Sequence, residues 1–395
     1  MLSALVRGLL LLLLAAGAGA PVAAHPIIPL PSSAESAAAI ERMADWQLAH
    51  LGEPDAIPRP GPSARNPRDW QQAAFWVGLT AVADRSPSPR FRNAILSTGR
   101  AVGWRLGGRP YHADDHLIGS VWLWASRHGA GREALAPMRA TFDAVLAAPQ
   151  TNSLTFVAPR QGDPACTTRW CWCDALFMAP PTLWELSRAT GDPRYAAFAD
   201  SEYRATAALL FDRENHLFFR DSRFFDQRGK TGEKLFWSRG NGWVISGLAR
   251  LIPQIPRGDP RRAYYVALFR EMAARLVTLQ RPNGFWPPSL LGDPATAADE
   301  SSGTGFYVHA LAWGIEAGLL PRDPYLPAVA RGWTALQGAI QPDGRLGWVQ
   351  QVSDRPDSVA AQDTQYYGVG AYLLAGAAVH DLSEMGRRRN KASRP

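Results

Sequence analysis

The chain has 395 residues, carries a formal net charge of +7 and contains 15 tryptophans. Residues 387–395 hold five of the positive charges, so the remaining chain is close to neutral and nucleic-acid binding has little support. The basic end at residues 385–395 is predicted to be a solvated, disordered tail.

Residues 1–24 have the pattern of a secretion signal, with a positive charge at Arg7, an apolar core at 8–16 and small residues at 22–24. The apolar run is shorter than the roughly 20 residues that a membrane span needs, and no later stretch comes near that length. We therefore expect an exported protein, periplasmic or extracellular, whose mature chain starts near His25 and has no membrane span. A retained N-terminal anchor is the alternative.

Apolar residues recur at helical spacing through most of the remaining chain. The clearest segments are residues 175–189, 200–210, 244–252, 264–276, 307–317 and 367–379. Short charged turns alternate with long loops rich in glycine and aromatic residues, which indicates helical hairpins arranged in a ring with a site built by the long loops. Short strands are expected only in loops, for example at 217–220. No linker divides residues 25–384, so we predict one domain there.

The first stretch whose side chains could take part in catalysis or binding is residues 111–120. There His112, Asp114, Asp115 and His116 precede an apolar helix. One interpretation is an acidic N-cap at the positive end of that helix. The other is an active-site carboxylate. A metal site has weaker support, because no helical H-x-x-x-H or acidic loop pattern is present.

Three cysteines, Cys166, Cys171 and Cys173, lie within eight residues. Export would permit a disulfide, and any bridge should use Cys166, since Cys171 and Cys173 are too close in sequence to pair easily. No C-x-x-C pair or nearby histidine completes a zinc site.

The chain is organised around residues 171–181, which place Asp174 among aromatic and small apolar residues. A carboxyl group in such surroundings loses hydration, so its neutral form is favoured and it can act as a proton donor. Pro180 and Pro181 suit the first turn of a helix, which places Asp174 at or just before a helix N-terminus. The alternative is that Asp174 only caps that helix.

A further stretch, residues 236–243, sets Arg239 between Trp237 and Trp243, next to Gly-Asn-Gly. The guanidinium fork suits a carboxylate and the indole faces suit a sugar ring. The alternative is a tight loop with both tryptophans in the core. Small hydroxylated residues at 299–306 fit either a pocket floor or the start of a helix.

Together these stretches resemble the unsaturated glucuronyl and rhamnogalacturonyl hydrolases of glycoside hydrolase families 88 and 105. The resemblance covers essentially the whole mature chain, and residues 172–181 and 237–243 are its most specific motifs. It implies an all-α fold, the (α/α)6 toroid, with minor β pieces in loops. It also implies an enzyme that removes a 4,5-unsaturated uronic acid from the non-reducing end of polysaccharide-lyase products by hydrating the double bond. The rhamnogalacturonan type is favoured, with ulvan and arabinogalactan products open.

The resemblance also implies roles for individual residues. Asp174 matches the general acid/base, and Asp115, preferred to Asp114, matches the second aspartate. The other substrate-binding candidates are Trp172, Arg239, Trp237, Trp243, Met178, Asp114, His112 and Arg220. Arg220 stands where family members often carry a histidine, so it could contact a carboxylate or sulfate, or point to solvent. No cofactor and no metal is implied, because protonation and hydration need none.

Two other functions fit the same residues. One is a conventional inverting glycosidase on the same toroid, with Asp115 as base and Asp174 as acid. The other is a catalytically inactive sugar-binding protein.

Overall fold

The computed structural model describes residues 29–52, 57, 66–293 and 297–392. Six long helices form its inner ring: α2 (Trp70–Ala83), α5 (Ile118–Ala125), α8 (Pro180–Thr190), α10 (Ser238–Leu251), α12 (Ser301–Glu316) and α14 (Tyr366–Ala392). Each inner helix contacts the next, and α14 contacts α2, so the ring is closed. The predicted all-α toroid is confirmed.

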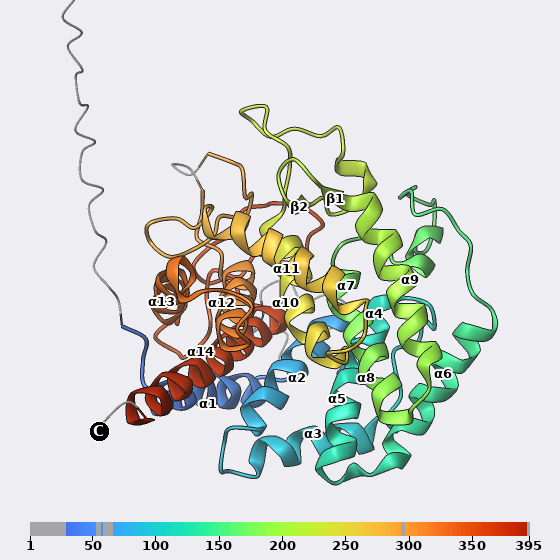
Figure 1. Ribbon diagram of the computed structural model, residues 1–395, viewed down its shortest axis with the longest axis horizontal. Coiled ribbons are helices and arrows are strands. Elements are labelled where there is room, and N and C mark those ends of the chain that lie inside the picture. Colours follow the sequence, from blue (N-terminus) through green and yellow to red (C-terminus); the bar gives the residue numbers. More distant parts are fainter. Residues whose placement is uncertain (1–28, 53–56, 58–65, 294–296, 393–395) are drawn as a thin grey trace, which may run out of the picture.

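A second ring of helices packs around the first. Its members are α1 (Ser33–Ala49), α3 (Arg90–Ala101), α6 (Ala136–Ala147), α9 (Pro193–Leu210), α11 (Arg262–Val277) and α13 (Arg322–Gly338). Figure 1 shows α6 and α9 outside α8 on one side of the molecule and α13 outside α12 on the other. Inner and outer helices alternate along the chain, as the hairpin pattern of the sequence predicted.

Short elements fill the connections. They are α4 (Ala113–His116), α7 (Ala175–Met178), a π-helical turn at Ser126–Ala130, and 3₁₀ turns at Arg132–Leu135, Ala165–Arg169, Ser222–Phe224 and Ile252–Gln254. Strands β1 (Phe211–Asp212) and β2 (Leu217–Phe218) pair antiparallel, with Phe211 opposite Phe218. The predicted β piece at 217–220 is therefore confirmed in part.

The inner helices are held together by burial on all sides and by close backbone contacts. Every residue of α5 is buried, as expected of a helix that is apolar all round. Gly78 and Gly370 let α2 and α14 cross closely, since a Cβ on Gly370 would lie 2.3 Å from the carbonyl oxygen of Ala74. A larger residue at either glycine would force these helices apart.

The N-terminal ends of the inner helices meet at one end of the ring. Glu300 caps α12 and also accepts a hydrogen bond from the backbone of Gln350, in the loop before α14. In that loop the carbonyl oxygen of Gln350 accepts from Arg239 in the first turn of α10 and from the hydroxyl of Tyr367 in α14. Loops far apart in the sequence are thus joined at this end.

Two sequence-based boundaries need correction. The segment predicted as one helix from 175 to 189 breaks at Ala179 into α7 and α8, because Pro180 has no N–H to continue the ladder. The tail predicted to be disordered from 385 is instead helical through Ala392. Ser383 and Glu384 bond to Pro31 and Ser33, which ties the last helix to the start of α1.

The predicted secretion signal at 1–24 lies outside the described residues. Among the described helices, none has the length and apolar character needed to cross a membrane.

The buried cap of α12 should matter for stability. Glu300 is fully buried and accepts bonds from the backbone N–H groups of Ser302 and Gly303, at 2.9 and 2.7 Å. Glu300→Ala is therefore expected to lower the free energy of unfolding by roughly 1–3 kcal/mol, measured by urea denaturation. Glu316→Ala, at the exposed end of the same helix, is the control. Equal effects of the two changes would contradict a structural role for the cap.

Candidate active site

Asp174 lies at the N-cap position of α7, as predicted, but its side chain makes no capping hydrogen bond. The thiol of Cys173 donates to its Oδ2 at 3.4 Å, and Nε of Arg220 lies 3.7 Å from the same oxygen. Only 11% of the side chain is exposed. Burial raises the pKa of Asp174, and this outweighs the lowering by the charges of Arg220 and Arg239. The side chain is thus suited to hold a proton rather than to cap a helix.

Asp115 is engaged in a structural ion pair. Its carboxylate accepts from the backbone N–H of Arg109 at 2.7 Å and from Nε and Nη2 of the same guanidinium at 3.1 and 2.6 Å. Gly107 packs against it so closely that a Cβ there would lie 2.3 Å from its carboxyl carbon. These contacts use both oxygens of Asp115 to hold the 107–109 loop, so the structure favours Asp114 over the predicted Asp115 as the second carboxylate.

Asp114 is the carboxyl group that remains available. It lies in α4, which contacts α7, and its side chain accepts no hydrogen bond from any described residue. Its side chain is 16% exposed. Burial raises its pKa to about 8; Arg109 opposes this shift, and the negative charges of Asp174 and Asp115 add to it. Asp114 and Asp174 thus form a pair of acids that influence each other.

His112 and Trp172 lie beside this pair. The two rings pack with centroids 4.7 Å apart, and Nδ1 of His112 accepts from the backbone N–H of Asp114 at 3.3 Å. Burial, followed by the charge of Arg109, lowers the pKa of His112 to about 3, so the ring is neutral with its proton on Nε2. That N–H bonds to none of the residues that the structure describes, so it can serve a ligand hydroxyl.

Arg239 has a different role from the one predicted. Its side chain has no exposed surface, and Nη1 and Nη2 donate to the carbonyl oxygens of Gln350 and Gln351 at 2.8 and 3.0 Å. The guanidinium lies between Trp237, at 4.3 Å, and Tyr367, at 4.7 Å. Direct contact with a substrate carboxylate is excluded in this conformation, so the effect of Arg239 on the site is electrostatic, through Asp174.

The other predicted contacts on α7 and α10 lie in the interior. Trp243 has no exposed surface and packs on Phe177 and Phe306, with ring centroids 4.7 and 4.2 Å away. Met178 is buried as well. The predictions that Trp243 and Met178 bind substrate are therefore wrong for this structure, because both complete the core. Trp237 is nearly buried, and its indole N–H donates to the side chain of Gln350 at 2.9 Å.

Arg220 faces the site and not the solvent. Its guanidinium donates through Nη1 to Asp221 at 2.8 Å, while its backbone carbonyl accepts from the N–H of Cys173 at 2.8 Å. Asp221 is fully buried and also binds Arg223. Sequence reasoning missed Asp221 and Arg223; their only signal was that two charged residues lie within three positions after Arg220.

The cysteines follow the sequence prediction. Cys166 and Cys171 form a disulfide, and Cys173 is a buried free thiol. Within the described ranges, no group of three His, Cys, Asp or Glu side chains is placed to hold a metal ion.

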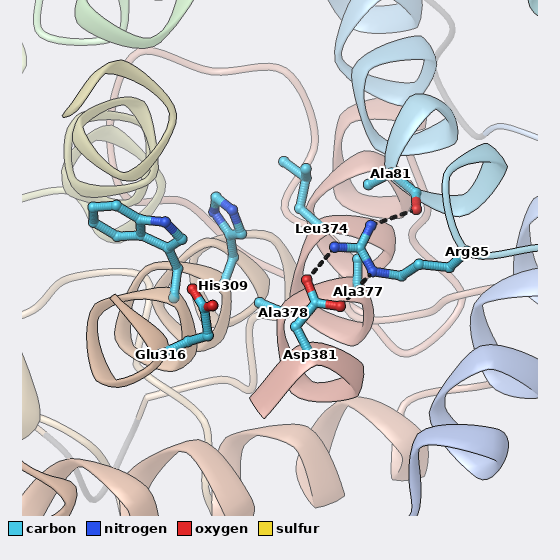
Figure 2. A pocket seen from close by; sticks show the side chains of 9 residues that line it. Ala81, Arg85, His309, Glu316, Leu374, Ala377, Ala378 and Asp381 are labelled. Carbon is cyan, nitrogen blue, oxygen red and sulfur yellow. Dashed lines mark hydrogen bonds and ion pairs between the residues drawn. The ribbon is translucent and has the colours of Figure 1, made fainter. Parts of the chain in front are cut away.

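The opposite end of the ring holds a separate small cavity of about 90 Å³ (Figure 2). Its lining includes His309, Trp313 and Glu316 of α12. Figure 2 shows Arg85 bound to Asp381 and to the carbonyl oxygen of Ala81, which ties α14 to α2 there. The cavity lies toward the C-terminal ends of the inner helices, away from Asp174.

With this geometry in view, comparison with known proteins identifies the family. The model of Glycosyl Hydrolase Family 88 matches residues 39–383. The chain belongs to glycosyl hydrolase family 88. It is therefore a glycoside hydrolase, as the motifs predicted.

Relatives in the family are similar over most of their length. The chain is 37% identical to an unsaturated 3S-rhamnoglycuronyl hydrolase of Alteromonas sp. (strain LOR), over 89% of this chain and 87% of the relative. It is 36% identical to a protein of the same name from Formosa agariphila, over 80% and 86%. A family 88 structure from Bacteroides vulgatus superposes with a TM-score of 0.76 at 24% identity, covering 89% of this chain and 100% of that one, which supports the fold.

Proposed function

We propose that the protein removes a 4,5-unsaturated uronic acid from the non-reducing end of oligosaccharides released by polysaccharide lyases. The observation that carries the proposal is the pair Asp114 and Asp174, two poorly solvated carboxyl groups with raised pKa values at the N-terminal end of the inner ring. Membership of family 88 supports the same reaction class.

The reaction begins with proton transfer to an enol-ether carbon. Asp174 gives its proton to carbon 4 of the unsaturated ring, and positive charge develops at carbon 5 and the ring oxygen. Water adds to carbon 5 and returns a proton to the Asp174 carboxylate. The resulting hemiketal opens and releases the linked sugar. Asp114, protonated below about pH 8, takes the role first given to Asp115 and orients the water or a sugar hydroxyl.

The ring pair of His112 and Trp172 supplies the sugar-binding surface. A neutral imidazole can donate its Nε2 hydrogen to a hydroxyl, and the indole of Trp172 packed against it adds an apolar surface. Both groups lie next to Asp114 in sequence or in space, so they would hold the uronate ring beside the proton donor.

We also propose that the linked sugar is rhamnose and that the protein acts after export. The two relatives with 36–37% identity are named unsaturated 3S-rhamnoglycuronyl hydrolases, which supports a substrate in which the uronate is linked to a rhamnose-type sugar. Export is supported by the signal-like residues 1–24 and by the disulfide between Cys166 and Cys171, since such bonds persist in oxidising compartments.

The test is a panel of lyase-generated disaccharides in which an unsaturated uronate is linked to rhamnose, to 3-sulfated rhamnose, or to another sugar. The expected result is loss of the conjugated-acid absorbance, fastest with the rhamnose-linked compounds. Saturated disaccharides of the same composition are the control and should stay intact. Cleavage of the saturated compounds with unchanged absorbance would instead identify a conventional glycosidase, and binding without turnover would identify a sugar-binding protein.

A further inference from the structure

A thiol donor and a guanidinium nitrogen converge on one oxygen of Asp174. The thiol of Cys173 donates to Oδ2 at 3.4 Å, and Nε of Arg220 lies 3.7 Å from the same atom, within ion-pair range. The hydrogen bond from Cys173 and the ion pair with Arg220 both fall on Oδ2 and not on Oδ1. The two oxygens of the carboxyl group are therefore chemically different before any substrate binds.

The thiol of Cys173 and the guanidinium of Arg220 are themselves fixed in place. Arg220 is held by Asp221, which is fully buried and also bound by Arg223. The thiol of Cys173 is seated against the first turn of α10, where a Cβ on Gly240 would lie 3.1 Å from the sulfur. The N–H of Cys173 donates to the carbonyl oxygen of Arg220 at 2.8 Å, so the two residues are tied together.

The chemistry of these groups separates the two oxygens further. Burial raises the pKa of the Cys173 thiol, so the sulfur keeps its hydrogen and acts as a donor. An oxygen that receives an S–H bond and faces a guanidinium carries the negative charge, and the proton of the neutral acid then resides on the other oxygen. Arg239 and Asp114 also act on Asp174, from α10 and α4.

We infer that Cys173 and Arg220 are positioning residues that hold Oδ2 of Asp174, so that Oδ1 carries the proton and delivers it. The delivery step rests on the proposed function, whereas the anchoring of Oδ2 does not. Arg220 then acts through Asp174 and not as a contact for the substrate carboxylate.

Kinetics with matched variants test the delivery step. Cys173→Ser keeps a donor of similar size and should stay within about twofold of the parent in kcat, whereas Cys173→Ala should lower kcat about five- to tenfold. Arg220→Gln should lower kcat about tenfold or more with little change in KM, and Arg220→Lys should recover part of the loss. Equal activity of the two Cys173 variants, or a rise in KM alone for Arg220→Gln, would overturn the inference.

Infrared spectroscopy tests the anchoring without any substrate. Cys173 is the one free thiol among the three cysteines, so the S–H stretching band belongs to it. The band should move to higher frequency when Asp174 is protonated and also in Asp174→Asn, because the acceptor is then weaker. In Arg220→Gln the midpoint of this pH titration should rise by about one unit or more, since a stabilising charge is lost.

The two proposals can fail separately. A band that titrates as expected, in a protein that hydrates none of the unsaturated disaccharides, refutes the proposed function and keeps the anchoring. A band that is insensitive to pH and to Asp174→Asn, in an active enzyme, refutes the anchoring and keeps the function.

Discussion

Asp174→Asn is expected to lower kcat/KM on unsaturated disaccharides by roughly 10²- to 10⁴-fold, the usual contribution of a proton donor. The amide has the same shape but no acidic proton. Because Asp174 has a raised pKa and caps no helix, the variant should fold normally. The measurements are steady-state rates from the absorbance loss and thermal unfolding of the purified variant.

Asp226→Asn is the matched control, since it makes the same chemical change at an exposed aspartate, in the loop between β2 and α10. It should leave both rate and melting temperature unchanged. If Asp174→Asn keeps activity within tenfold of the parent while the control behaves as stated, another group must donate the proton and Asp174 loses its assigned role.

Replacing each of the neighbouring aspartates Asp114 and Asp115 by asparagine in turn is expected to give the second large effect, a loss of activity in one variant and of stability in the other. Asp114→Asn should lower kcat/KM by roughly 10²-fold with little loss of stability, because the amide lacks the acidic O–H that orients the water or a sugar hydroxyl. Asp115→Asn should instead lower the free energy of unfolding by about 1–3 kcal/mol, because it weakens the hydrogen-bonded ion pair between the buried Asp115 and the partly exposed Arg109. Parallel kinetics and urea denaturation of both variants separate the roles. A larger loss of kcat/KM in folded Asp115→Asn would restore the original preference.

The pH dependence of kcat/KM should reflect the protonation of Asp114. Burial raises the pKa of Asp114 to about 8, so its protonated form is present below that pH and is lost above it. The parent kcat/KM is therefore expected to decline above about pH 8, and Asp114→Asn should decline less steeply there. A profile that is flat to pH 10 would show that neither carboxyl group needs its proton.

The ring of helices and the proton donor Asp174 could be predicted from the sequence, because both depend on residues that are close together along the chain. Helical periodicity and regular turns encode the hairpins, and the apolar neighbours of Asp174 encode its burial. Neighbouring residues such as Asp114 and Asp115 cannot be ranked in this way. Which of the two side chains turns away from the site depends on Gly107, which packs against Asp115, and on Arg109, which pairs with it. These contacts are seen only in the folded structure.

Long-range contacts account for the other errors. Arg239 between two tryptophans suggested a ligand fork, but its partners are the carbonyl oxygens of Gln350 and Gln351, more than a hundred residues later. The contact between Arg220 and Asp174 also spans distant segments. No spacing or periodicity in the sequence indicates which loops will meet at the end of the ring.

The burial of Arg239 links two properties that a protein engineer would want to change separately. This one cation fastens the 350–351 loop and also contributes to the electric field at Asp174. Remodelling that loop to admit other sugars would therefore alter the acidity of the proton donor at the same time. Selection for a new substrate and selection for a new working pH are expected to favour changes in the same few residues.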